Sequence, residues 1–373
     1  MKTIFCTLLL LMGFTCVFGK FQQNAFYNVK NFGATGNGKT DDLASIQRCI
    51  DSAIRQNKSV YIPAGIYNVS NTIKVNLTGK KHLAIVGDST QTATIKCSDK
   101  LTYIIYVVSP EYQYGGEIKI KGISVEGNNV PYSANHPYIN KAAMGIGILV
   151  HNLNNVQISD VTVKNIYGQG IQVTSSTLKT KLEDRADNVS INNCKIINCW
   201  GFHPQADDYG DGIYVAFVKK ASINNNTIKN DLNVTKQYGR AGLVLEYSAE
   251  NCHVEGNNIS GYDRNIHIEG DLGGHQIVNN TLSGTDLGIL VYGAKSTQNH
   301  PLTITGNTID ASSNYNARDA KTFRSVRGGI VFQGSPDIYN GSVIQNNKIN
   351  MSGKKSAPLN IDRSYRMDVK NNN

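Results

Sequence analysis

The sequence lacks the features that mark several common classes of protein. No Cys-x-x-Cys spacing predicts a zinc site. No run of like charge and no alternation of aromatic and basic residues indicates nucleic-acid binding. Beyond residue 19 there is an odd number of cysteines, which are expected to be mostly small buried side chains: Cys49, Cys97, Cys194, Cys199 and Cys252. A disulfide between Cys194 and Cys199, or one between turns, stays open.

The amino terminus has the composition of an export signal. Residues 2–19 combine Lys2, an apolar run from Ile4 to Met12 and small residues ending at Gly19, which predicts a signal peptide and is too short for a membrane span. We therefore expect a secreted or periplasmic protein without a membrane span. The formal charge of +9 falls to +8 without Lys2, which is compatible with an anionic polysaccharide partner.

A short apolar strand after a small residue recurs eight times from residue 147 onward, as in Gly-Ile-Leu-Val at 147–150 and again at 288–291. The first apolar residues of these strands are Ile148, Ile171, Ile213, Leu243, Ile266, Ile289, Ile330 and Leu359. Their spacings are 23, 42, 30, 23, 23, 41 and 29 residues, so a 23-residue turn carries insertions. Such a period predicts a solenoid.

A second series, of the form Ile-x-x-Asn-x-Ile, lies between these strands, so each turn holds at least two strands and no helix. Its asparagines share one phase of successive turns: Asn226, Asn257, Asn280, Asn307, Asn347 and Asn372. We expect a ladder of stacked amides at a left-handed bend. Parallel strands joined in this way are almost always right-handed. The predicted fold class is all-β, a right-handed parallel β-helix.

The region after the signal predicts a cap for the first turn. Leu43, Ile46, Ile50 and Ile54 recur at helical spacing behind an aspartate, and a strand follows at 60–67. This capping helix would cover an open strand edge. We therefore predict a signal peptide at 1–19 and one domain at 20–373, with a cap over about residues 20–75.

The segment 27–75 contains Gly-Asn-Gly-Lys-Thr-Asp-Asp, Ile-Gln-x-x-Ile-Asp and Val-Tyr-Ile-Pro-Ala-Gly-x-Tyr. It resembles the opening of the pectate-lyase-like superfamily, which implies a β-helix and carbohydrate chemistry in a groove along one sheet. The overall layout is similar to that of secreted alginate C5-epimerase modules. Their Tyr-Gly-Phe-Asp-Pro-His-Glu strand falls on residues 169–175, where Gln172 and Thr174 replace its Asp and His.

A second partial resemblance is to polygalacturonases, whose Asn-Thr-Asp-Gly-Ile strand is similar to residues 209–213. This resemblance implies an acid role for Asp211. The other polygalacturonase motifs fall on Arg240-Ala241 and Arg264-Asn265 and are absent.

Alternation along the repeated strands predicts two columns of outward side chains. The first contains Leu149, Gln172, Tyr214, Val244, His267, Leu290, Val331 and Asn360, and the second contains His151, Thr174, Ala216, Glu246, Glu269, Tyr292, Gln333 and Asp362. Neighbouring strands lie about 4.8 Å apart, so Glu246 and Glu269 should stand side by side, as paired carboxylates do in glycosidases. The candidate catalytic residues are Asp211, Glu246, His267 and Glu269.

The candidate substrate-binding residues are Tyr214, Arg240, Arg264, Tyr292, Trp200 and His203. Insertions at 200–210, 231–239 and 312–327 should rise along one edge of this surface and help to build the site. No cofactor is expected, apart from a candidate calcium pair at Asp207 and Asp208.

Three functions remain open at this point. The simplest is a polysaccharide hydrolase in which Asp211, Glu246 and Glu269 supply acid and base. The second is a uronate lyase or C5-epimerase, with an arginine neutralising the uronate and His267 or Tyr214 moving the C5 proton. The third is a glycan-binding or adhesin β-helix without catalysis. The sugar, the linkage and the oligomeric state are left open.

The carboxyl end repeats the first half of the Ile-x-x-Asn-x-Ile unit at residues 367–373 and then stops. We therefore expect the last turn to lack a complete cap and residues beyond about Arg366 to be poorly anchored. Whether the natural chain continues past Asn373, or this end packs against another subunit or under a loop such as 352–358, is left open.

Overall fold

The computed structural model describes residues 26–79, 81–97, 103–109, 116–127, 145–175, 182–201, 210–232, 239–293, 301–313, 327–334, 336–361 and 365–373. The predicted signal peptide, His203, the candidate calcium pair Asp207 and Asp208, and Asp362 lie outside these residues. In the part of the chain that is described, no helix is long and apolar enough to cross a membrane.

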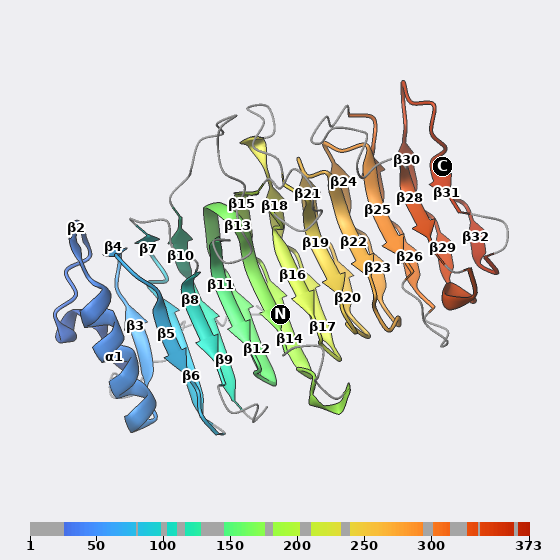
Figure 1. Cartoon of the computed structure of the whole chain (residues 1–373). Coiled ribbons are helices and arrows are strands. Elements are labelled where there is room, and N and C mark those ends of the chain that lie inside the picture. The colour runs from blue at the N-terminus through green and yellow to red at the C-terminus, as the bar shows by residue number, and fades with distance from the viewer. Residues whose placement is uncertain are drawn as a thin grey trace, which may run out of the picture.

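The chain winds into a right-handed parallel β-helix, as predicted, with its strands stacked from one end of the molecule to the other (Figure 1). All strand pairs between turns in the sheet described next are parallel. The first sheet contains β1 (Phe26–Asn28), β3 (Ser59–Ile62), β6 (His82–Gly87), β9 (Glu117–Lys121), β12 (Asn155–Ser159), β14 (Asn188–Asn192), β17 (Ala221–Asn224), β20 (His253–Glu255), β23 (Gln276–Val278), β26 (Thr303–Thr305), β29 (Val343–Gln345) and β32 (Asp368–Lys370).

Each complete turn adds a strand to two further sheets, which are joined through the long strand β13. The second sheet contains β2 (Asn37–Asp41), β4 (Gly65–Val69), β7 (Ala93–Cys97), β10 (Ile123–Glu126), the first part of β13 (Thr162–Thr174), β15 (Lys195–Trp200), β18 (Thr227–Lys229), β21 (Asn258–Ser260), β24 (Thr281–Ser283), β27 (Thr308–Asp310) and β30 (Lys348–Asn350). The third contains β5 (Ile73–Asn76), β8 (Tyr103–Val108), β11 (Gly145–His151), the end of β13, β16 (Ile213–Ala216), β19 (Ala241–Glu246), β22 (Arg264–Glu269), β25 (Leu287–Tyr292), β28 (Gly328–Gln333) and β31 (Leu359–Asn360).

The predicted helix closes the amino-terminal end of this stack. Helix α1 (Leu43–Gln56) lies over the first turn (Figure 1) and buries Ile46, Cys49 and Ile50. The side chain of Asp42 does not cap the helix, because its carboxylate accepts hydrogen bonds from the backbone amides of Thr35 and Gly36. The neighbouring Asp41 accepts from the amide of Leu43 instead. Short 3-10 helices cover residues 29–32, 182–184 and 336–339.

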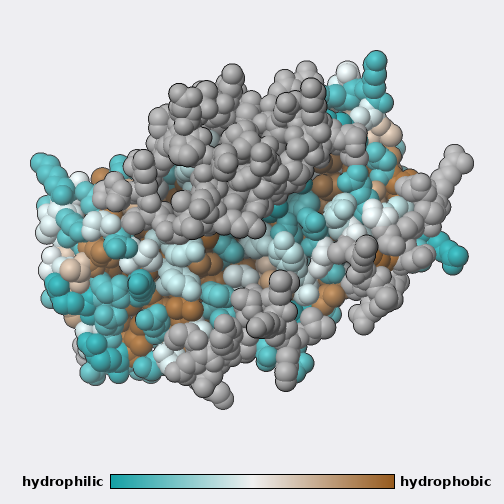
Figure 2. Space-filling model, in the orientation of Figure 1, coloured by the Kyte–Doolittle hydropathy of each residue, from teal (hydrophilic) through white to brown (hydrophobic). Residues whose placement is uncertain are grey.

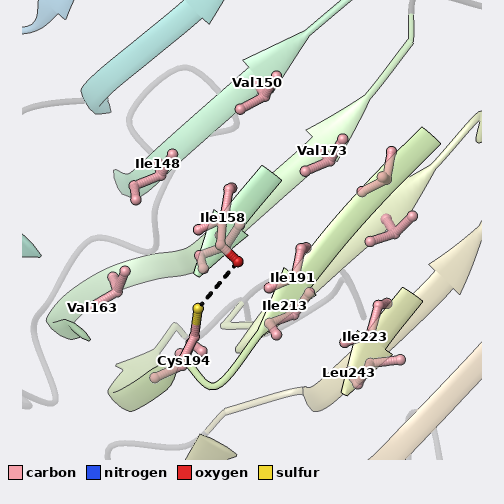
Figure 3. Close-up of a cluster of buried hydrophobic side chains, with 14 of the residues drawn as sticks. Ile148, Val150, Ile158, Val163, Val173, Ile191, Cys194, Ile213, Ile223 and Leu243 are labelled. Atoms are coloured by element: carbon pink, nitrogen blue, oxygen red, sulfur yellow. Dashed lines mark hydrogen bonds between the residues drawn. The ribbon is translucent and has the colours of Figure 1, made fainter. Parts of the chain in front are cut away.

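Aliphatic side chains from all three sheets fill the interior (Figure 3). The first apolar residue of each repeated strand, from Ile148 to Ile330, is fully buried. Cys194 lies among them, with its thiol directed at the carbonyl oxygen of Ile158 at 3.7 Å. All five cysteines of the described residues are buried and free, so the open alternative of a disulfide between Cys194 and Cys199 is not observed.

The asparagine ladder is confirmed at the bend between the first and second sheets. The side-chain oxygen of Asn257 accepts from both the backbone and the side-chain nitrogen of Asn226, at 3.0 and 2.9 Å. The same pair of bonds recurs at each step down to Asn372. The predicted place of the left-handed bend was wrong by one residue. Positive φ angles belong to the preceding positions: Asn225, Gly256, Asn279, Gly306, Asn346 and Asn371.

The carboxyl end is better anchored than the sequence predicts. Strand β32 pairs with β29, and the amide of Asn373 donates to the carbonyl of Asn347 at 3.0 Å. Backbone pairing therefore holds the last residues in place. Val369 nevertheless remains 40% exposed, because no further turn covers it in the described structure.

Candidate functional site

The third sheet carries the two predicted columns in the predicted register. Tyr214 pairs with Val244, and Val244 pairs with His267. In the second column Glu246 pairs with Glu269, and Glu269 pairs with Tyr292. The sequence therefore placed these side chains correctly relative to one another. We call the cluster of polar side chains on β16, β19 and β22 the candidate site. It contains Tyr214, Glu246, His267 and Glu269.

Asp211 lies at the base of the candidate site and is fully buried. Its two carboxylate oxygens accept from Nε and Nη2 of Arg240, at 2.8 and 3.0 Å. The side-chain amide of Gln169, one turn earlier, donates to the same carboxylate at 2.9 Å. The Asp211 carboxyl group is thus bound by two neighbouring side chains and has no access to solvent, so the structure does not support the predicted acid role.

Glu246 stands between this ion pair and the rest of the site. Arg240 Nη1 donates to its Oε1 atom at 3.1 Å, and His267 Nε2 lies 3.3 Å from that same oxygen. Burial by itself would raise the pKa of Glu246. The Arg240 charge, with hydrogen bonds from His267 and Tyr214, outweighs burial and lowers the pKa to about 2. Glu246 is therefore ionised at neutral pH.

Tyr214 reaches the same carboxylate from β16. Burial, and then the negative charge of Glu246, raise the pKa of its phenol well above the usual range. The hydroxyl therefore keeps its proton and donates a hydrogen bond to the carboxylate of Glu246. It serves as a hydrogen-bond donor and not as a base.

His267 joins the buried and exposed parts of the candidate site. Its Nε2 atom lies 2.8 Å from Oε2 of Glu269, and its Nδ1 atom lies 3.5 Å from Nη1 of Arg264. A guanidinium can only donate, so a neutral His267 would accept at Nδ1 and direct the proton on Nε2 at the glutamates. His267 itself is 2% exposed, whereas the Glu269 side chain is 40% exposed.

Arg264 is also engaged within the protein. Its Nη2 atom lies 3.0 Å from the carboxylate of Asp263, which is fully buried. Arg240 and Arg264, both predicted to bind substrate, thus each bind a buried aspartate that lies just before a strand of the third sheet. The sequence missed Gln169 and Asp263. Gln169 could have been found by rung count, since it occupies the turn before Asp211.

The expected open surface is for the most part covered, which corrects the prediction of a site accessible along both columns. Alternation places Tyr214, Val244 and His267 on the outward face, yet none of them is more than 9% exposed. Hydrophilic and hydrophobic residues intermingle on the described part of the face in Figure 2. Of the predicted site residues that the structure describes, Glu269 and Tyr292 are the ones that reach solvent, and Tyr292 is 44% exposed.

Trp200 does not take the predicted position for stacking on a sugar. It ends strand β15 and is 1% exposed. Its ring packs against Tyr167 with the centroids 4.5 Å apart, so it belongs to the packed interior. His203 lies outside the described residues, and its predicted role stays a prediction.

Glu246, His267 and Glu269 bring three potential metal ligands within 4.8 Å of one another. A metal on Nε2 of His267 would displace the proton to Nδ1, where it would face the donor groups of Arg264. Arg240 already occupies Oε1 of Glu246. These residues suit a chain of proton donors and acceptors better than a metal centre.

Comparison with known families agrees with the architecture. Residues 26–230 match the family model described as rhamnogalacturonase A/epimerase, pectate lyase-like. The chain belongs to this family. The resemblance of its opening to pectate-lyase-like proteins is thereby confirmed.

Relatives of this pectate-lyase-like chain include enzymes and a phage protein. It is 39% identical over 112 residues to alginate lyase 7 of Azotobacter vinelandii, which covers 27% of the chain and 13% of the relative. It is 44% identical over 77 residues to mannuronan C5-epimerase AlgE5 of the same organism, covering 20% and 8%. The pre-neck appendage protein of Bacillus phage B103 is 28% identical over 159 residues, covering 40% and 17%. The chain thus spans only a small part of these relatives.

Solved structures share the fold at low identity. The Dettilon tailspike protein matches with a TM-score of 0.57 and 14% identity, over 93% of this chain and 68% of that chain. The Streptococcus pneumoniae surface protein and adhesin PfbA matches with a TM-score of 0.51 and 16% identity, over 93% and 96%.

Proposed function

We propose that this protein cleaves a polysaccharide by hydrolysis at the carboxyl ends of β19 and β22, with Glu269 as the general acid and base. The observation that carries the proposal is the pair of glutamates on adjacent strands that share Nε2 of His267 at 3.3 and 2.8 Å. One of the two is buried and held ionised, and the other is exposed. Two carboxyl groups in different environments are what glycoside cleavage requires.

The roles follow from access to solvent. Glu269 can reach a glycosidic oxygen because its side chain is 40% exposed. Glu246 is 4% exposed and acts as a positioning residue that fixes His267 and supplies negative charge beneath the sugar. Such charge stabilises an oxocarbenium-like transition state. Arg240, Asp211 and Gln169 keep Glu246 in place.

The lyase or epimerase alternative draws support from the alginate lyase and epimerase relatives. Its chemistry needs a cation that neutralises the uronate carboxylate. Arg240 and Arg264 are the arginines predicted for this task, and they are 4% and 2% exposed and bound to buried aspartates. Because both arginines are buried and already bound to aspartates, they are poorly placed to neutralise a substrate carboxylate. Their burial favours hydrolysis.

A glycan-binding protein without catalysis is the remaining candidate. The observation that favours it is the burial of Asp211, Arg240 and Glu246 in a network whose charges compensate one another. Such a network can be purely structural.

Product analysis distinguishes the three candidates. The purified protein is incubated with alginate, rhamnogalacturonan and glucan, and the products are measured by reducing-end assay, ultraviolet absorbance and NMR. Hydrolysis gives new reducing ends without an unsaturated product. Ultraviolet absorbance from an unsaturated uronate would replace the proposal by a lyase, and a C5-inverted polymer would replace it by an epimerase. Binding without any product would leave the non-catalytic candidate.

A further inference from the structure

Two aromatic residues at the edge of the candidate site adopt a backbone conformation that side chains of their kind rarely take. Phe217 and Tyr247 directly follow β16 and β19 and have φ angles of 52° and 45°. At the same step of other turns the chain uses Asn152, Gly270 and Gly334, which tolerate positive φ. Phe and Tyr cost free energy in this conformation, and strain of this kind collects at functional sites.

The two rings form a stacked pair on successive turns. Their centroids are 5.8 Å apart and their planes differ by 12°. The backbone amide of Phe217 donates to the carbonyl of Tyr247, so the pair follows the ladder of the third sheet. Phe217 packs on the outward cluster around Tyr214 and is partly buried, whereas Tyr247 is 51% exposed. The pair is thus anchored at one end and presents an aromatic ring at the other.

The next turn places the exposed glutamate next to Tyr247. The residue at the following step is Gly270, which has no side chain. The backbone amide of Tyr247 donates to the carbonyl of Glu269 at 3.2 Å. The exposed ring and the exposed carboxyl group therefore reach solvent at the ends of adjacent strands, about 4.8 Å apart.

We infer that Tyr247, supported by Phe217, is a stacking platform for one pyranose ring of the polysaccharide and aligns the neighbouring glycosidic bond with Glu269. This inference rests on the proposed function. The apolar face of a pyranose ring would lie on the aromatic face. The strain at Tyr247 is retained because Asn or Gly at this step would hold the bend but would offer no ring.

The test compares Tyr247→Asn with Tyr247→Phe, both in a Glu269→Gln background that prevents turnover. Binding of oligosaccharides prepared from alginate, rhamnogalacturonan and glucan is measured by calorimetry, and the melting temperature is measured in parallel. We expect Tyr247→Phe to bind within about twofold of its parent, because it keeps the ring. We expect Tyr247→Asn to bind about tenfold more weakly, the loss of one aromatic stacking contact, with an unchanged or higher melting temperature.

The outcomes separate the two proposals. Equal affinity of Tyr247→Asn and its parent would overturn the platform alone, as would a loss of affinity that occurs together with a lower melting temperature. Weaker binding by Tyr247→Asn, together with no cleavage of any polysaccharide by the unsubstituted protein that retains Glu269, would support the platform and reject hydrolysis. Absence of oligosaccharide binding by the parent would reject both.

Discussion

Arg240 donates two hydrogen bonds to the carboxylate of Asp211, with Nε 2.8 Å from Oδ1 and Nη2 3.0 Å from Oδ2. Both side chains are buried, and Nη1 of this arginine donates to Oε1 of Glu246 at 3.1 Å. The ion pair therefore fixes the position from which Arg240 controls the charge of Glu246. The pair supports the candidate site from the buried side and has no direct role in the proposed proton transfer.

Asp211→Asn is expected to destabilise the fold, because it leaves a buried guanidinium short of charge compensation. The expected loss is about 3 kcal/mol in the free energy of unfolding, measured by urea denaturation. The control is Asp231→Asn, which removes an exposed partner of Lys229 and should change stability by less than about 0.5 kcal/mol. Equal stability of the two variants would contradict a structural role for the Arg240 pair.

The ionised state of Glu246 predicts a pH dependence of stability. Its pKa is lowered from 4.5 to about 2 in the folded protein. A lowered folded pKa stabilises the protein above the unfolded value, and this stabilisation is lost as the pH falls from about 4.5 towards 2. The difference between the two values corresponds to about 3 kcal/mol.

Denaturation of the parent and of Glu246→Gln at pH 6 and pH 3 measures this contribution. The parent should lose more stability than the variant over this interval, since the variant has no carboxylate to protonate. Parallel loss in both proteins would show that Glu246 titrates normally.

The asparagine ladder offers a test between two adjacent residues of the same type. Asn280 is buried and its side-chain amide makes four hydrogen bonds, two through Oδ1 and two through Nδ2. Asn280→Ala should cost at least about 2 kcal/mol, because it leaves buried donors and acceptors of neighbouring turns unpaired. Asn279→Gly should be nearly neutral, since it only replaces one residue at a φ of 56° by another that tolerates it. Thermal unfolding of the two variants distinguishes the ladder from the bend.

The sequence determined the register of the candidate site because turns of fixed phase stack with their equivalent residues paired. Glu246 and Glu269 were placed side by side from rung count alone, and the structure pairs them. Alternation assigns a face to each side chain, but it does not say whether another part of the chain covers that face. Tyr214 and His267 were therefore expected at an open surface and are buried.

The residue pattern also could not predict which charged side chains pair with one another. Arg240 was predicted to bind substrate, whereas it closes on Asp211 in the preceding turn. The pairing depends on side-chain reach across turns and on burial, which rung count does not measure. The platform at Tyr247 was missed for a similar reason, because a positive φ at an aromatic residue leaves no trace in the residue pattern.

Glu269 is proposed to transfer the proton in glycoside cleavage. The most direct test is the rate at which the parent and Glu269→Gln release new reducing ends from the polysaccharide that the parent degrades, with the melting temperatures measured alongside. Because this side chain is 40% exposed, the two melting temperatures should agree. We expect Glu269→Gln to release reducing ends at least about a hundredfold more slowly than the parent, because a general acid usually contributes this much to the rate. A Glu269→Gln variant that cleaves at the parental rate would contradict it.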